Sequence, residues 1–254
     1  MRYFIQLSYK GTKYCGWQIQ PNGNTIQEVV TKALSTILRE KIDLTGAGRT
    51  DTGVHALFYI AHFDSENTEL HTDTNLIFKL NGYLPKDISV HLISVVKPDA
   101  NARFDAISRT YVYYIHQQKD PFLEEISWYY PHKLTIDLMN QASEILLGYN
   151  DFTSFSKLHT DVKTNNCKIF HAQWKKENYK LEFEIKADRF LRNMVRAIVG
   201  TLIDVGKNKI TLDDFIEIIE NKNRNDAGIS VPAHGLFLTK IEYPENIFYK
   251  NLSS

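Results

Sequence analysis

Residues 46–56 (GAGRTDTGVHA) place three chemically active side chains in one short stretch that also contains three glycines. Arg49, Asp51 and His55 supply a guanidinium, a carboxylate and an imidazole, while the glycines let the backbone bend tightly and approach a ligand closely. A nearby guanidinium favours the charged form of a carboxylate, and a charged, fixed aspartate can act as a nucleophile or a general base. The pattern indicates a candidate site centred on Asp51, with His55 as a structural hydrogen-bond partner. The structural alternative is that Asp51 caps a turn and Arg49 pairs with it.

A second cluster of polar residues follows in the last third of the chain. Arg189, Arg192, Asn193 and Arg196 have the spacing i, i+3, i+4 and i+7, which predicts that they share one face of a helix over residues 189–205. Three arginines without an acid on that face indicate that an anion lies opposite, either a phosphate or Asp51. The alternative is an ordinary solvated face.

Aromatic residues near an arginine form a third candidate. Tyr111, Tyr113 and Tyr114 are expected in one strand with Arg109. Such rings can stack on unpaired RNA bases, as they do on RNA-binding surfaces. Tyrosines in strands more often pack in the core or against a neighbouring strand, so this pattern by itself favours neither interpretation.

Several other chemistries lack their motifs. The histidines are scattered, with no HExxH or CxxC spacing for a metal, and there is neither a GxxxxGK[ST] phosphate loop nor a GxSxG turn. Cys15 and Cys167 are too few for a disulfide framework and are expected to be thiols in a reducing cytoplasm. No run of about 18 apolar residues and no signal-peptide pattern is found, so we expect no membrane segment.

Charge is balanced in total but segregated along the chain. The sequence has 30 basic and 30 acidic residues, although a nucleic-acid-binding protein is usually basic. Residues 1–49 contain seven Lys or Arg against three acids, whereas residues 64–73 contain four acids and neither Lys nor Arg. This distribution permits a basic face for RNA without establishing one.

The hydrophobic periodicity predicts an α+β protein with mainly antiparallel sheets. Helices are expected at 26–38, 75–83, 136–147, 189–205 and 212–221, and strands at 3–9, 42–45, 57–63, 88–96, 109–117, 168–176, 180–187 and 236–243. Thr25 and Glu28 have the capping-box spacing before the first helix. We expect two halves, residues 1–105 with the Asp51 loop and residues 106–254.

Seven segments, in order along nearly the whole chain, together resemble the TruA family of tRNA pseudouridine synthases. Residues 14–20 (YCGWQIQ) are similar to its YxGWQxQ segment, and residues 48–56 (GRTDTGVHA) to its GRTDxGVHA catalytic loop, with Thr52 in place of the commoner alanine. The others are LNGYLPKDI at 80–88, RFDA and RTYVY at 103–106 and 109–113, DFTSF at 151–155, MVRAIVG at 194–200 and PAHGL at 232–236.

The resemblance implies a homodimer of two similar α+β halves with the active site in a cleft between them. It implies that Asp51 is the nucleophile on a uridine of the tRNA anticodon stem-loop at position 38, 39 or 40, without cofactor or metal. Arg196 would pair with Asp51, Arg49 would help displace the base from its stack, Tyr111 would stack on the uracil, and Leu236 would form an apolar wall.

Two alternatives remain open at this point. One is a catalytically inactive paralogue that binds or folds RNA. The other is a carboxylate-dependent glycosidase or base-excising hydrolase, which generally needs two cooperating carboxyl groups, and no second acid lies near Asp51 in the sequence.

Overall fold

The computed structural model describes residues 1–21, 23–157 and 164–249. The chain forms two compact units, one of Met1–Ile107 with Leu238–Ser254 and one of Ser108–Phe237, which we call unit 1 and unit 2. The division into halves 1–105 and 106–254 stays a prediction. The compact units differ from it in that the chain returns to unit 1 at Leu238.

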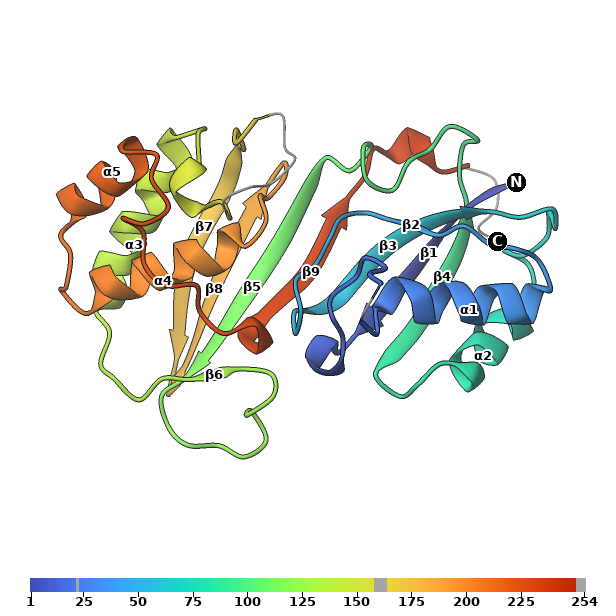
Figure 1. The fold of residues 1–254 in the computed structure, drawn as a ribbon, viewed down its shortest axis with the longest axis horizontal. Coiled ribbons are helices and arrows are strands. Elements are labelled where there is room, and N and C mark those ends of the chain that lie inside the picture. The colour runs from blue at the N-terminus through green and yellow to red at the C-terminus, as the bar shows by residue number, and fades with distance from the viewer. Residues whose placement is uncertain (22, 158–163, 250–254) are drawn as a thin grey trace. The chain divides into compact units, whose positions relative to one another are not determined.

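Unit 1 is an antiparallel sheet with helices on one face (Figure 1). The strand order is β4 (Ile88–Val95), β1 (Arg2–Tyr9), β3 (His55–Asp64) and β9 (Leu236–Glu242), and the short β2 (Thr45–Gly46) pairs with β3. Helices α1 (Ile26–Leu38) and α2 (Thr74–Tyr83) lie across one side of this sheet. The centre of β1 is completely buried at Tyr3, Ile5 and Leu7, so the core of unit 1 lies between the sheet and the helices.

Helix α1 begins where its sequence predicts. The Thr25 side chain accepts a hydrogen bond from the Glu28 N–H, which satisfies one of the free donors of the first turn. Ile26, Val30 and Leu34 are buried at helical spacing, so one face of α1 packs into unit 1.

Unit 2 repeats the combination of antiparallel strands and helices. Its strand order is β5 (Ser108–His116), β8 (Lys180–Ala187) and β7 (Ile169–Glu177), with β6 (Trp128–Tyr129) parallel to β5. The helices are α3 (Ile136–Ile145), α4 (Met194–Gly206) and α5 (Leu212–Glu220). Short 3-10 turns lie at Leu146–Gly148, Thr153–Phe155 and Ala233–Gly235 in unit 2, and at Gly11–Lys13 and Glu245–Ile247 in unit 1. In β8 the strict alternation of the sequence gives one buried and one wetter face, as expected. The predicted α+β class with mainly antiparallel strands is confirmed.

The strand expected at residues 42–45 is wrong except for its last residue. Ile42 and Leu44 are buried in alternation, which produces the period of a strand. Their backbone groups, however, bond to side chains of α1: the Ile42 N–H donates to Ser35 Oγ (3.2 Å), and Gln27 Nε2 donates to the Leu44 carbonyl (2.6 Å). Side-chain partners here replace the neighbouring strand.

The helix expected from residue 189 begins five residues later, at Met194. The Asp188 carboxylate accepts the Arg189 N–H (2.7 Å), and the Arg192 carbonyl accepts the Lys157 N–H (3.1 Å). Asn193, the N-cap, has a left-handed backbone with φ 67°. Arg189 and Arg192 therefore do not share a helix face with Arg196, and the predicted three-arginine face is wrong.

Among the residues that the structure describes, every helix is too short or too polar to cross a membrane.

Candidate active site

The candidate nucleophile Asp51 lies in unit 1, in the loop that connects β2 to β3. Two backbone hydrogen bonds hold this loop against the N-terminal segment: the Trp17 N–H donates to the Thr50 carbonyl, and the Gly53 N–H donates to the Tyr14 carbonyl, both at 3.3 Å. Within the loop the Val54 N–H donates to the Asp51 carbonyl (3.1 Å). The backbone on both sides of Asp51 is therefore fixed by residues 14–17.

Gly16 lets the two segments approach this closely. A Cβ atom at this position would lie 2.2 Å from the Thr50 carbonyl oxygen, far inside van der Waals contact, and the Gly16 φ of +86° disfavours any other residue. Gly53, at the other end of the loop, also has a positive φ of +80°. By contrast, a Cβ at Gly48 would meet no atom within 4 Å. Glycine is therefore required at Gly16, where the two segments touch, and favoured at Gly53, where the backbone turns, but it is not required at Gly48.

Buried tyrosine side chains hydrogen-bond to residues of the loop. Tyr9 and Thr50 are both buried, and their hydroxyl groups share a hydrogen bond of 2.9 Å. The Tyr59 hydroxyl donates to the Gly48 carbonyl, and its ring stacks on Trp17 at a centroid distance of 4.1 Å. These contacts connect the loop to the unit 1 core.

His55 is buried, and its Nδ1 accepts a hydrogen bond from the Gly11 N–H (2.9 Å). The expectation that His55 is a structural hydrogen-bond partner agrees with this contact. A further residue ties the N-terminal segment down: the Tyr14 hydroxyl donates to the Asp87 carboxylate (2.7 Å). Burial, together with this carboxylate, raises the pKa of the Tyr14 hydroxyl, so Tyr14 remains the donor.

Exposure separates the two charged side chains of the loop. Arg49 is exposed, whereas Asp51 is half-buried. A half-buried carboxylate on a fixed backbone can present an oxygen to a ligand, and an exposed guanidinium can reach a larger anionic one. The sequence singled out both residues, but it did not single out the supporting contacts of Tyr9, Tyr59 and Asp87.

The predicted substrate-binding residues Tyr111, Arg196 and Leu236 all lie in unit 2. Tyr111 is in β5, opposite Ile185 of β8, and its half-buried ring meets the ring of Phe190 edge-on at 5.2 Å and 89°. This contact fixes the orientation of the Tyr111 ring, which is a requirement for stacking on a planar base.

Arg196 lies in the first turn of α4 and is joined to the segment that precedes β9. Its Nε donates to the Val231 carbonyl (2.7 Å), and the Val231 N–H donates to the Arg196 carbonyl (3.2 Å). A Cβ at Gly200, one turn further along, would lie 1.8 Å from the Ile229 carbonyl oxygen, so the segment runs directly against the helix. The Arg196 guanidinium is thus oriented by backbone contacts on one side.

Leu236 is the first residue of β9 and is only 5% exposed. The segment before it is connected to β5, because the Tyr113 hydroxyl donates to the Pro232 carbonyl (2.8 Å) and a Cβ at Gly235 would meet the Tyr113 ring at 2.8 Å. Residues 231–236 therefore join Arg196 of α4, the β5 strand that carries Tyr111, and Leu236. This connection was not visible in the sequence.

Within residues 1–21, 23–157 and 164–249, no group of three or more His, Cys, Asp and Glu residues is placed to hold a metal ion.

Comparison with known proteins gives one consistent result. The family profile described as "tRNA pseudouridine synthase" matches residues 6–105 and 142–244. The chain is 57% identical to tRNA pseudouridine synthase A of Bacteroides fragilis over 248 residues, covering 97% of this chain and 98% of the relative. It is 54% identical to the same-named protein of Parabacteroides distasonis over 250 residues, covering 97% and 98%.

Similarity to a solved structure is much weaker. The crystal structure of the archaeal box H/ACA sRNP Nop10–Cbf5 complex aligns with 11% identity and a TM-score of 0.36, covering 89% of this chain and 59% of that one.

Proposed function

Because the chain belongs to the tRNA pseudouridine synthase family, we propose that it isomerises uridines 38, 39 and 40 of the tRNA anticodon stem-loop, with Asp51 as the nucleophile. Its reaction class is that of the family: it is an isomerase that acts on uridine in tRNA. The anticodon positions rest on the resemblance of nearly the whole chain to the family, and the role of Asp51 rests on the resemblance of residues 48–56 to its catalytic loop.

The observation that carries the assignment of Asp51 is the fixed backbone around it. Thr50 and Gly53 are bonded to the N-terminal segment, and Gly16 permits the contact. A nucleophile is effective when its reacting atom is already in position, because the entropy of orientation is then lost on folding instead of in the transition state. A turn-capping aspartate would not need this support from residues 14–17.

The reaction needs only the substrate's own atoms. The carboxylate of Asp51 attacks C1′ of the ribose, and the N1–C1′ bond breaks with its electron pair on N1 of the uracil. The uracil rotates, C5 forms the new bond to C1′, and the carboxylate leaves. Loss of the C5 proton and protonation of N1 complete the isomerisation. Because the uracil ring itself accepts the electron pair of the broken bond, the reaction needs no cofactor.

The other residues have roles that suit their environments. By resemblance to the family, Arg196, which is oriented by Val231, is proposed to pair with Asp51. Tyr111, fixed by Phe190, is proposed to stack on the uracil and to help remove the C5 proton. The exposed Arg49 helps displace the base from its stack, at a cost of a few kcal/mol. Leu236, which is buried, forms the apolar wall of the base site.

The proposal also covers assembly and place of action: a cytoplasmic homodimer, with the active site of each copy in a cleft between its two halves. The rival function is an inactive paralogue that only binds or folds RNA. It is less well supported, because binding alone has no need of a carboxylate fixed in position.

The test uses tRNA transcripts labelled with tritium at C5 of uridine. Formation of pseudouridine releases the C5 hydrogen to water, whereas base excision leaves the label on free uracil. The native protein should release tritium, and Asp51→Asn should bind tRNA without releasing any. Asp99→Asn is the matched control, because Asp99 is an exposed acid in the same unit.

Each outcome discriminates between the functions. Tritium released by Asp51→Asn at the native rate contradicts the nucleophile assignment. A native protein that binds tRNA but releases no tritium supports the paralogue, and labelled free uracil supports a hydrolase. Mapping the product within the tRNA tests positions 38, 39 and 40.

A further inference from the structure

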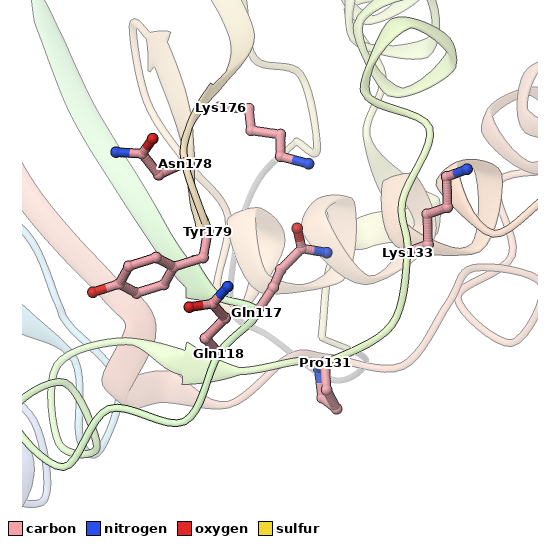
Figure 2. Close-up of a pocket in the computed structure, with 7 residues that line it drawn as sticks. All are labelled: Gln117, Gln118, Pro131, Lys133, Lys176, Asn178 and Tyr179. Carbon is pink, nitrogen blue, oxygen red and sulfur yellow. The ribbon is translucent and has the colours of Figure 1, made fainter.

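Unit 2 contains a hollow of about 450 Å³ at the turn between β7 and β8, which we call the hairpin hollow (Figure 2). It lies at the end of β5, and the side chains that line it are almost all polar. Apart from Pro131, they are Gln117, Gln118, Lys133, Lys176, Asn178 and Tyr179. None of these is an acid, so the two lysines give the lining positive charge, while the amide and hydroxyl groups offer both hydrogen-bond donors and acceptors.

Hydrogen bonds hold the frame of the hollow together. The Gln117 N–H donates to the Tyr179 carbonyl (2.8 Å), which joins the end of β5 to the hairpin turn. Gln117 Nε2 donates to the His132 carbonyl (2.6 Å), which fixes the segment that carries Lys133. The Tyr179 hydroxyl donates to Asp120 (3.2 Å), so this carboxylate is already engaged. These bonds fix the backbone frame of the hollow at Gln117, His132 and Tyr179.

Several donors of the lining have no partner among the described residues. Within the described part of the chain, the side chains of Lys133, Lys176 and Gln118 form neither a hydrogen bond nor an ion pair. Figure 2 shows Lys176 and Gln117 extending from the strands toward the segment that carries Lys133. The lining thus carries two exposed lysines and no carboxylate, so its charge favours an anionic ligand.

We propose that the hairpin hollow binds a phosphodiester group of the tRNA, at a contact separate from the reacting uridine. This inference rests on the proposed function for its RNA. Six residues of β5 and its continuation separate Tyr111 from Gln117, which corresponds to roughly 20 Å of strand. The phosphate bound here therefore belongs to a nucleotide other than the one that stacks on Tyr111, and the contact adds affinity and register without touching the chemistry.

The test measures tRNA binding directly, as a function of salt, for the native protein and for the double variant Lys133→Gln/Lys176→Gln. Each phosphate contact contributes about 0.7 to 0.9 to the slope of log K against log salt. Loss of one contact should reduce this slope by about that amount. If the native protein and the variant bind tRNA equally at 1 M salt, the variant should therefore bind roughly five- to eightfold more weakly at ~0.1 M salt. At saturating tRNA the rate of tritium release should stay at the native value.

Lys175→Gln is the matched control. Lys175 precedes Lys176 in β7 and is also exposed, but successive side chains of a strand point to opposite faces, so it lies away from the hollow. It removes the same charge from the same strand and should leave the salt slope unchanged.

Because tRNA binding is measured independently of the reaction, the proposed function and the proposed phosphate contact can fail separately. If the native protein binds tRNA but forms no pseudouridine, the proposed function fails while the salt slope still decides the hollow. If the double variant and Lys175→Gln show the same affinity and slope, the hollow proposal is overturned and the function stands. If the double variant loses only its binding of inorganic phosphate, the hollow is a small-anion site and the RNA assignment is wrong. A native protein that does not bind tRNA overturns both.

Discussion

Substitution of Gly16 by alanine is the most direct perturbation of the geometry around Asp51, because it replaces none of the proposed catalytic residues. The new Cβ would begin 2.2 Å from the Thr50 carbonyl oxygen, whereas ordinary contact begins at 3.4 Å. Both atoms belong to or adjoin the backbone, so neither can rotate away. The two segments must separate by about 1 Å, or the strain must remain in the folded state.

The magnitude follows from two contributions. A residue with a Cβ in the left-handed region costs about 1–2 kcal/mol, and overpacking of a close contact costs about 1–3 kcal/mol. If the loop stays in place, the free energy of unfolding should fall by about 2–5 kcal/mol. If the loop instead moves by about 1 Å, stability recovers, but a misplaced nucleophile can lower the rate about 100-fold.

Urea unfolding measures the loss of stability, and tritium release from C5-labelled tRNA under single-turnover conditions measures the loss of rate. Gly48→Ala is the control, since it lies in the same loop and its Cβ would meet no atom within 4 Å. We expect it to change the free energy of unfolding by no more than about 0.5 kcal/mol and to leave the rate unchanged. If Gly16→Ala is as stable and as active as Gly48→Ala, contact between residues 14–17 and the loop does not position Asp51.

Two further predictions concern Arg196 and His62. Arg196→Lys keeps the charge but loses the hydrogen bond from Nε to the Val231 carbonyl. A charged hydrogen bond contributes about 1.5–3 kcal/mol, so its loss should slow tritium release about 10- to 100-fold with little change in tRNA affinity. An unchanged rate would refute the role of the oriented guanidinium. Burial, assisted by the charge of Arg2, lowers the pKa of His62, whose Nδ1 accepts the Ala102 N–H (3.1 Å). The unfolded state therefore takes up this proton at a higher pH than the native state, and stability should fall as the pH drops below about 6.5. Between pH 7 and pH 5, the free energy of unfolding measured in urea should fall less for His62→Gln than for the native protein. An equal fall in both proteins would contradict the assignment to His62.

Local signals in the sequence were sufficient for most secondary structure. The alternation of residues 180–187 predicted β8 within its bounds, and the Thr25 cap with its apolar helical spacing predicted α1, because both patterns depend on neighbours a few residues apart. The candidate loop could also be located, since a carboxylate, a guanidinium and three glycines lie within a few residues of each other.

The failures arose where distant groups took over the backbone hydrogen bonds. Residues 42–44 have the alternation of a strand, but Gln27 and Ser35 of α1 bind their backbone, so no strand forms. Residues 189–193 have helical spacing, yet the Asp188 carboxylate and the left-handed Asn193 hold the chain in a turn before α4. Periodicity records which side chains are buried, and it does not record which groups satisfy the backbone.

The sequence by itself thus determined the class of fold, the family resemblance and the position of the candidate loop, because each is encoded in residue types at short and fixed spacing. Only the tertiary structure decided what holds that loop: the approach of Gly16 to Thr50, the Tyr9 and Tyr59 hydroxyl groups beneath it, and the bond from Tyr14 to Asp87. It likewise brought Lys133 and Lys176 to one hollow, although 42 residues of sequence separate them. These contacts join segments far apart in the chain, and their geometry exists only after the strands and helices have packed.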